Sequence, residues 1–113
     1  MIFLHILADF NLQGFMAQAK QKEYWKINAS NEMYKFDYII VLLLHSFMWS
    51  FMIMIPIALY FGICTLTIVL FFLNIILHAI IDNEKANRKT INLNTDQIFH
   101  IIQIILTYLI VII

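Results

Sequence analysis

Residues 38–60, YIIVLLLHSFMWSFMIMIPIALY, run for 23 positions without a charged side chain. A helix rises about 1.5 Å per residue, so this stretch is long enough to cross a hydrocarbon core about 30 Å thick. A second apolar stretch covers residues 62–82, and Gly62 provides the turn between the two. We therefore expect an antiparallel pair of membrane helices.

The rest of the chain is also strongly apolar. Of its 113 residues, 63% are hydrophobic and 12% are charged, and the mean hydropathy is +0.85; this is well outside the balance of soluble domains. Two further apolar segments, 1–16 and 97–113, lie at the short limit for a membrane span. We expect an all-α fold, with residues 1–113 forming one integral membrane bundle of four helices, about 1–16, 38–60, 62–82 and 97–113. A net charge of zero gives no reason to expect a nucleic-acid partner.

The positive charges predict the orientation of this bundle. All seven Lys and Arg residues lie in two loops, between the first and second segments and between the third and fourth. The positive-inside rule makes these loops cytoplasmic and places both termini on the non-cytoplasmic side of a cell membrane, such as a bacterial inner membrane. Three lysines of the first loop, Lys20, Lys22 and Lys26, are expected to face water or lipid phosphate.

Histidine and aspartate recur together within the apolar segments. His5 and Asp9, His78 and Asp82, and Asp96 and His100 are each four residues apart and so share a helix face. His45 lies on a further helix, and at helical rise all seven residues fall in the cytoplasmic half of the bilayer. The predicted ligands of a metal ion are His5, Asp9, His45, His78, Asp82 and His100, with Asp96 as a ligand or a general base. Nitrogen and carboxylate ligands without thiolate suit zinc, manganese or iron, in one site or two adjacent ones.

Amide side chains near these residues are expected to orient the ligands by hydrogen bonds. The candidates are Gln13, Asn74, Gln97 and Gln103. Simpler roles exist for individual residues: polar side chains also join membrane helices, Asp96 could cap a helix, and Asp82 could mark the exit into water. The recurrence of His and Asp at one depth on three segments favours a shared site, because joining helices does not require it.

Four motifs resemble those of a known family. They are HILADFNLQGFMAQAK (5–20), LLLHSF (42–47), HAIIDNEKA (78–86) and DQIFHII (96–102). Together they resemble a family of small bacterial and phage membrane proteins catalogued as domain of unknown function 3307. The resemblance implies that the nine matching His, Asp and Gln residues belong to the family pattern, but it supplies no function. A looser likeness to membrane-bound metal-dependent hydrolases with paired His and Asp supports the metal hypothesis by analogy.

Three functions remain open from the sequence. The first is a metal-dependent hydrolase acting on a lipid or lipid-linked substrate at the cytoplasmic face, with Asp96 as its catalytic residue. The second is a carrier or relay for protons or metal ions, which is disfavoured because the outer halves of residues 38–82 offer few polar groups. The third is a non-enzymatic membrane protein, such as a phage-type pore or a partner subunit. Membrane lipids are the expected partners, with a second copy or another membrane protein as further candidates.

Overall fold

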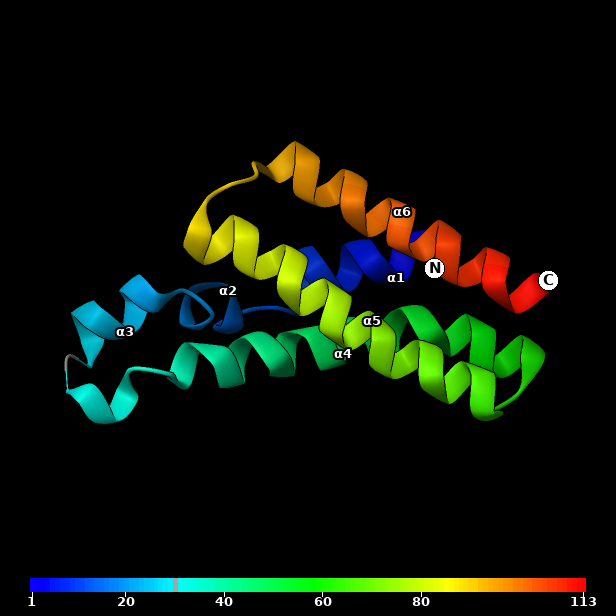
Figure 1. The fold of residues 1–113 in the computed structure, drawn as a ribbon, viewed down its shortest axis with the longest axis horizontal. Helices are drawn as coiled ribbons and strands as arrows, with labels where there is room; N and C mark the ends of the chain where they lie inside the picture. The colour runs from blue at the N-terminus through cyan, green and yellow to red at the C-terminus, as the bar shows by residue number, and fades with distance from the viewer. Residues whose placement is uncertain (30) are drawn as a thin grey trace.

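The computed structural model describes residues 1–29 and 31–113, and these residues form helices joined by short turns, with no strand among them (Figure 1). Three helices are long: α4 (Asp37–Phe61), α5 (Thr65–Asn83) and α6 (Leu93–Ile112). The shorter elements are α1 (Ile2–Ile6), α2 (Met16–Ala19), α3 (Lys22–Asn28), the 3₁₀ turn η2 (Glu32–Tyr34) and two π-helical turns, η1 (Leu7–Asn11) and η3 (Glu84–Arg88). The molecule is elongated, with extents of 48 × 27 × 21 Å.

Helices α4, α5 and α6 are each long and apolar enough to cross a membrane. Their surfaces are apolar, with exposed side chains such as Leu44, Phe72 and Leu106, whereas histidine, aspartate, serine and asparagine are buried between them. This distribution is the reverse of that in a soluble protein, where large exposed apolar surfaces are rare. The chain is therefore an all-helical protein with three candidate membrane-spanning helices.

Capping groups set the ends of the long helices. Helix α4 ends at Phe61 because Gly62 adopts a positive φ of 82°, which favours glycine. Helix α5 begins at Thr65, three residues later than expected, since the Thr67 hydroxyl accepts a hydrogen bond from the backbone N–H of Cys64. Helix α6 begins at Leu93, four residues earlier than expected, because the Asn92 side chain accepts from the Thr95 N–H. The first residues of α5 and α6 are therefore set by capping side chains and not by the ends of the apolar runs.

The N-terminal segment is shorter than the sequence suggests. Its helical part covers Ile2–Asn11 and ends before Gly14, whose φ of 51° turns the chain toward α2. Ten helical residues rise about 15 Å, half of a hydrocarbon core. This segment packs against α4, and Figure 1 shows that the N-terminus lies short of the end of the molecule at which α6 ends.

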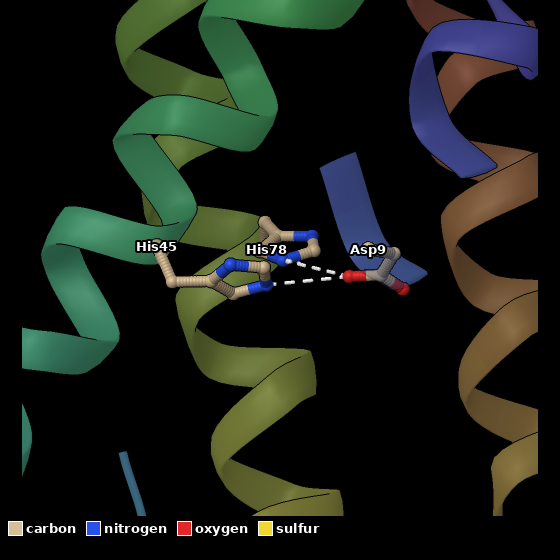
Figure 2. Close-up of side chains that lie close together, drawn as sticks. All are labelled: Asp9, His45 and His78. Carbon is tan, nitrogen blue, oxygen red and sulfur yellow. Dashed lines mark hydrogen bonds and ion pairs between the residues drawn. The ribbon is translucent and has the colours of Figure 1, made fainter. Parts of the chain in front are cut away.

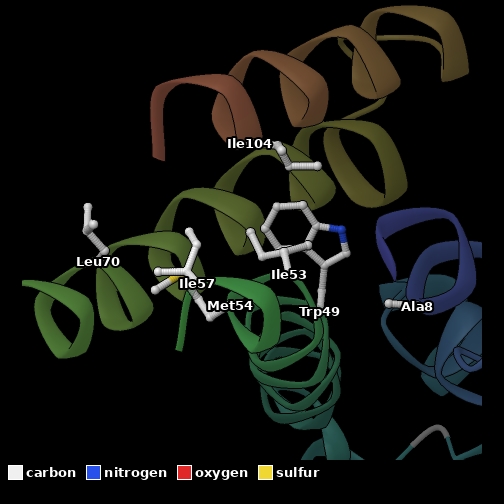
Figure 3. Packing of buried hydrophobic residues seen from close by; sticks show 7 residues of the cluster. All are labelled: Ala8, Trp49, Ile53, Met54, Ile57, Leu70 and Ile104. Carbon is white, nitrogen blue, oxygen red and sulfur yellow. The ribbon is translucent and has the colours of Figure 1, made fainter. Parts of the chain in front are cut away.

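An apolar cluster fills the centre of the bundle (Figure 3). It consists of Ala8, Trp49, Ile53, Met54, Ile57, Leu70 and Ile104. Because lipid tails are as apolar as these side chains, close packing contributes more here than removal from water. Trp49 lies at the edge of this cluster, where the apolar packing meets a group of polar side chains.

Candidate metal centre

All four histidines of the chain and three of its aspartates converge at one level of the bundle. His5 comes from α1, Asp9 from η1, His45 from α4, His78 and Asp82 from α5, and Asp96 and His100 from α6. Every one of these side chains belongs to a residue no more than 5% exposed. The spacing of four residues places each pair on the inner face of its own helix, as expected. The packing then brings the faces together.

Asp9 is the centre of the first group of potential ligands (Figure 2). Its Oδ1 atom is 3.2 Å from Nε2 of His45 and 3.9 Å from Nε2 of His78. The three residues offer ligand atoms that all lie within 4.8 Å of one another. A cation between them would take the place of the proton that His45 shares with Asp9.

Asp9 also belongs to a second group, with Asp96 and His100, whose ligand atoms again lie within 4.8 Å of one another. Nε2 of His100 is 3.2 Å from Oδ1 of Asp96, yet neither atom takes part in a hydrogen bond. The two side chains therefore lie within ion-pair distance of each other without the geometry of a hydrogen bond. Asp96 does not cap α6, because Asn92 fills that role.

Several buried polar atoms of the cluster have no hydrogen-bond partner in the described part of the chain. They are both ring nitrogens of His78 and His100, Nδ1 of His45, and Oδ1 of Asp82 and Asp96. A buried polar group without a partner costs about 1–3 kcal/mol, so such atoms need an explanation. Imidazole nitrogen and carboxylate oxygen are ligands that zinc, iron and manganese accept. The residues present therefore fit a divalent ion.

Gln97 joins three members of the cluster. Its Oε1 atom accepts a hydrogen bond of 2.9 Å from Nε2 of His5. Its Nε2 atom donates to Oδ2 of Asp9 at 2.9 Å and to Oδ2 of Asp96 at 3.0 Å. Gln13 contributes as well, because its amide donates to the backbone carbonyl of Asp9 at 2.8 Å. These two amides lie where the sequence suggested that orienting groups would be found.

Trp49 is the residue that sequence reasoning missed. Its Nε1 donates a hydrogen bond of 2.7 Å to Nδ1 of His5, and its ring stacks on His78 with centroids 4.2 Å apart. Since His5 bonds Gln97 through its other nitrogen, both nitrogens of this ring are engaged, and His5 belongs to neither ligand group. The available signal was spacing, because Trp49 follows His45 by four residues and shares its helix face.

Lys20 contradicts the expectation that it faces water or lipid phosphate. The residue is 3% exposed, and its Nζ lies 2.7 Å from Oδ2 of Asp82 and donates to Gln13 as well. Lys85 follows the same pattern, with Nζ 3.1 Å from Oδ2 of Asp96 and 3.7 Å from Oδ1 of Asp82. A buried carboxylate needs a compensating charge, and these two lysines provide it from the loop side of the cluster.

Asn74 and Gln103 form a separate polar contact further along α5 and α6. The Gln103 amide donates to Oδ1 of Asn74 at 2.7 Å, and the Asn74 amide donates to Thr107 at 3.0 Å. Within residues 1–29 and 31–113, neither amide forms a hydrogen bond with a His or Asp of the cluster. Their contacts join α5 to α6, as interhelical polar groups in membranes do.

Two π-helical turns carry residues of the site. Asp9 lies in η1, where the Leu12 N–H donates to the Leu7 carbonyl over five residues at 2.9 Å. Lys85 lies in η3 at the end of α5. A π turn widens the helix and shifts side chains from their regular angular positions, and such turns are frequent at functional sites.

Comparisons with models of protein families, with curated proteins and with solved structures found no match. The resemblance to domain of unknown function 3307 therefore remains a prediction from the four motifs. The function has to follow from the chemistry of the cluster itself.

Proposed function

We propose that this protein is a membrane-embedded, metal-dependent hydrolase that acts on a lipid or lipid-linked substrate at the cytoplasmic face. The observation that carries the proposal is the set of buried imidazole nitrogens and carboxylate oxygens without partners around Asp9. In a region of low dielectric constant, such a set is costly unless a cation compensates it.

In this proposal the ion is held by Asp9, His45 and His78. Three protein ligands leave a coordination position open, as in catalytic zinc sites. His5 and Gln97 orient this set, since Gln97 bonds the free oxygen of Asp9 and is itself fixed by His5. The ligand set is thus narrower than the sequence suggested, because His5 has both nitrogens engaged and Asp82 is paired with lysine.

A bound divalent ion would supply polarisation of a phosphoryl or carbonyl oxygen and a more acidic water molecule. Asp96 is the proposed general base, because its Oδ1 has no hydrogen-bond partner while Oδ2 is fixed by Lys85 and Gln97. His100 lies beside that free oxygen and can receive the proton next. Both residues lie next to Asp9.

The membrane arrangement belongs to the same proposal. Residues Ile2–Asn11 would act as a fourth helix that enters the bundle only about halfway. The two basic loops would be cytoplasmic, the C-terminus would lie on the other side, and the N-terminus would point toward that side from within the membrane. The distribution of the seven Lys and Arg residues supports this orientation. A cell membrane such as a bacterial inner membrane is the proposed location, consistent with the resemblance to domain of unknown function 3307.

One observation favours a carrier of protons or metal ions as a second candidate. Asn74, Gln103 and Thr107 form buried polar contacts along α5 and α6 beyond the cluster. These side chains bond mainly to one another, which makes the contact a closed link between helices rather than an open path. The hydrolase therefore remains the first candidate.

The deciding experiment is elemental analysis of the protein purified in detergent, comparing wild type, His78→Ala and the control Thr107→Val. We expect about one zinc, manganese or iron per chain in the wild type and the control, and loss of that metal in His78→Ala. The absence of metal from folded wild-type protein would refute the hydrolase and leave the non-enzymatic candidates. Ion flux in proteoliposomes, with metal bound, would favour the carrier over the hydrolase.

A further inference from the structure

A cavity of about 430 Å³ lies on the loop side of the cluster. Lys20, Lys85 and Lys89 line it together with the amides Gln13 and Gln21, and none of the described residues that line it is acidic. The segment around α2, together with η3 and the residues that follow η3, lines this cavity. It is therefore a basic pocket that borders the proposed metal centre.

Two of these lysines connect the cavity to the cluster directly. Lys20 contacts Asp82, and Lys85 contacts both Asp82 and Asp96. Lys85 is about one quarter exposed at its side chain, so it reaches both the carboxylates and the cavity. Lys89 forms an exposed ion pair with Glu23 at 3.3 Å, and such surface pairs contribute little to stability and are easily exchanged.

The charges of this region depend on the ion. Asp9, Asp82 and Asp96 carry three negative charges, and Lys20 and Lys85 carry two positive ones. With neutral histidines the formal sum is −1 without a divalent ion and +1 with it. A net positive charge in a buried site is costly. Binding of the ion therefore makes binding of an anion at the open side of the site, where the cavity lies, more favourable.

We infer that this cavity binds the phosphate group of the substrate, and that metal and phosphate bind cooperatively. The inference rests on the proposed metal centre and narrows its substrate class to phosphate esters. Lysine ammonium groups are common phosphate ligands. The cavity also lies where α5 ends and the polar loop begins, the level at which lipid phosphates are found. Its volume falls in the range of pockets that take small molecules.

The test measures binding of radioactive orthophosphate by equilibrium dialysis to purified protein in a neutral detergent, with and without bound Mn²⁺. We expect the Mn²⁺-loaded wild type to bind phosphate about tenfold more tightly than the same protein without metal, a common size for coupling between sites. Lys85→Gln should lose about tenfold in phosphate affinity, the effect of removing one charged hydrogen bond, while keeping its Mn²⁺. Lys85→Arg should retain most of the affinity, and the control Lys26→Gln, on exposed α3, should match the wild type.

A competition arm identifies the source of the phosphate. Mixed micelles containing phosphatidate displace the orthophosphate if the cavity takes a lipid phosphate, whereas micelles containing only phosphatidylcholine do not. If phosphatidate does not compete while orthophosphate still binds, the substrate is a water-soluble phosphate ester.

The inference is overturned if Mn²⁺ leaves phosphate affinity unchanged, or if Lys85→Gln binds phosphate as the wild type does. These results differ from a failure of the proposed function, which would appear as a folded protein that binds no metal at all. Binding of Mn²⁺ without binding of phosphate would support the metal centre and would exclude phosphate esters as substrates.

Discussion

Replacement of Gln97 by methionine tests whether the amide that joins His5, Asp9 and Asp96 organises the metal centre. Methionine keeps the length of the side chain and removes one acceptor and one donor group. The variant loses two hydrogen bonds to carboxylates, of 2.9 and 3.0 Å, and one to His5. The carboxylates then lose the group that holds them in place.

The expected magnitude follows from these bonds. A hydrogen bond to a charged group contributes about 1.5–3 kcal/mol, so the two carboxylate bonds set an upper range of about 3–6 kcal/mol. Gln97 is only partly buried, and water can replace part of this contribution. We therefore expect metal affinity to fall about 10- to 100-fold, the range typical for groups that orient metal ligands.

The assay is competition for Zn²⁺ between the detergent-purified protein and a fluorescent chelator of known affinity. Gln103→Met is the matched control, because it makes the same chemical change on the same helix but removes a contact to Asn74. We expect Gln103→Met to keep the wild-type affinity for Zn²⁺. An affinity of Gln97→Met within threefold of wild type, or an equal loss in both variants, would refute the assigned role.

Three further predictions follow from other contacts. Trp49→Phe keeps a stacked ring but leaves Nδ1 of His5 without its hydrogen-bond donor, so the free energy of unfolding should fall by about 1–3 kcal/mol. Chemical unfolding in mixed micelles measures this free energy, and an unchanged value would contradict the prediction. Asn74→Leu removes the polar link between α5 and α6 and should cost about 1 kcal/mol while metal content stays at the wild-type level, which elemental analysis checks. Cys64 is exposed at the turn after α4 and is the only cysteine of the sequence, so a membrane-impermeant maleimide should label it in intact cells. A Cys64→Ser, Lys26→Cys variant should react only after permeabilisation. The reverse labelling pattern would show that the proposed orientation is wrong.

The helical membrane character of this protein follows from its sequence alone. Uninterrupted apolar runs such as residues 38–60 can satisfy their backbone hydrogen bonds in lipid only as helices. The spacing of four between His78 and Asp82, and between Asp96 and His100, also determined locally that each pair shares one face. Helix ends were less predictable, because a single cap such as Asn92 extends α6 into a polar segment.

The tertiary structure alone decided which of these groups meet. Helical periodicity identifies a face, but it does not state how far a helix is rotated or shifted against its neighbours. The sharing of Asp9 between two ligand groups depends on a π turn at the end of a short first helix. The burial of Lys20 beside Asp82 joins residues 62 positions apart, and charge pairing across that distance has no signature in local sequence. For the same reason the hydrogen bond from the Trp49 indole N–H to His5 could not be predicted, because it depends on the packing of α1 against α4.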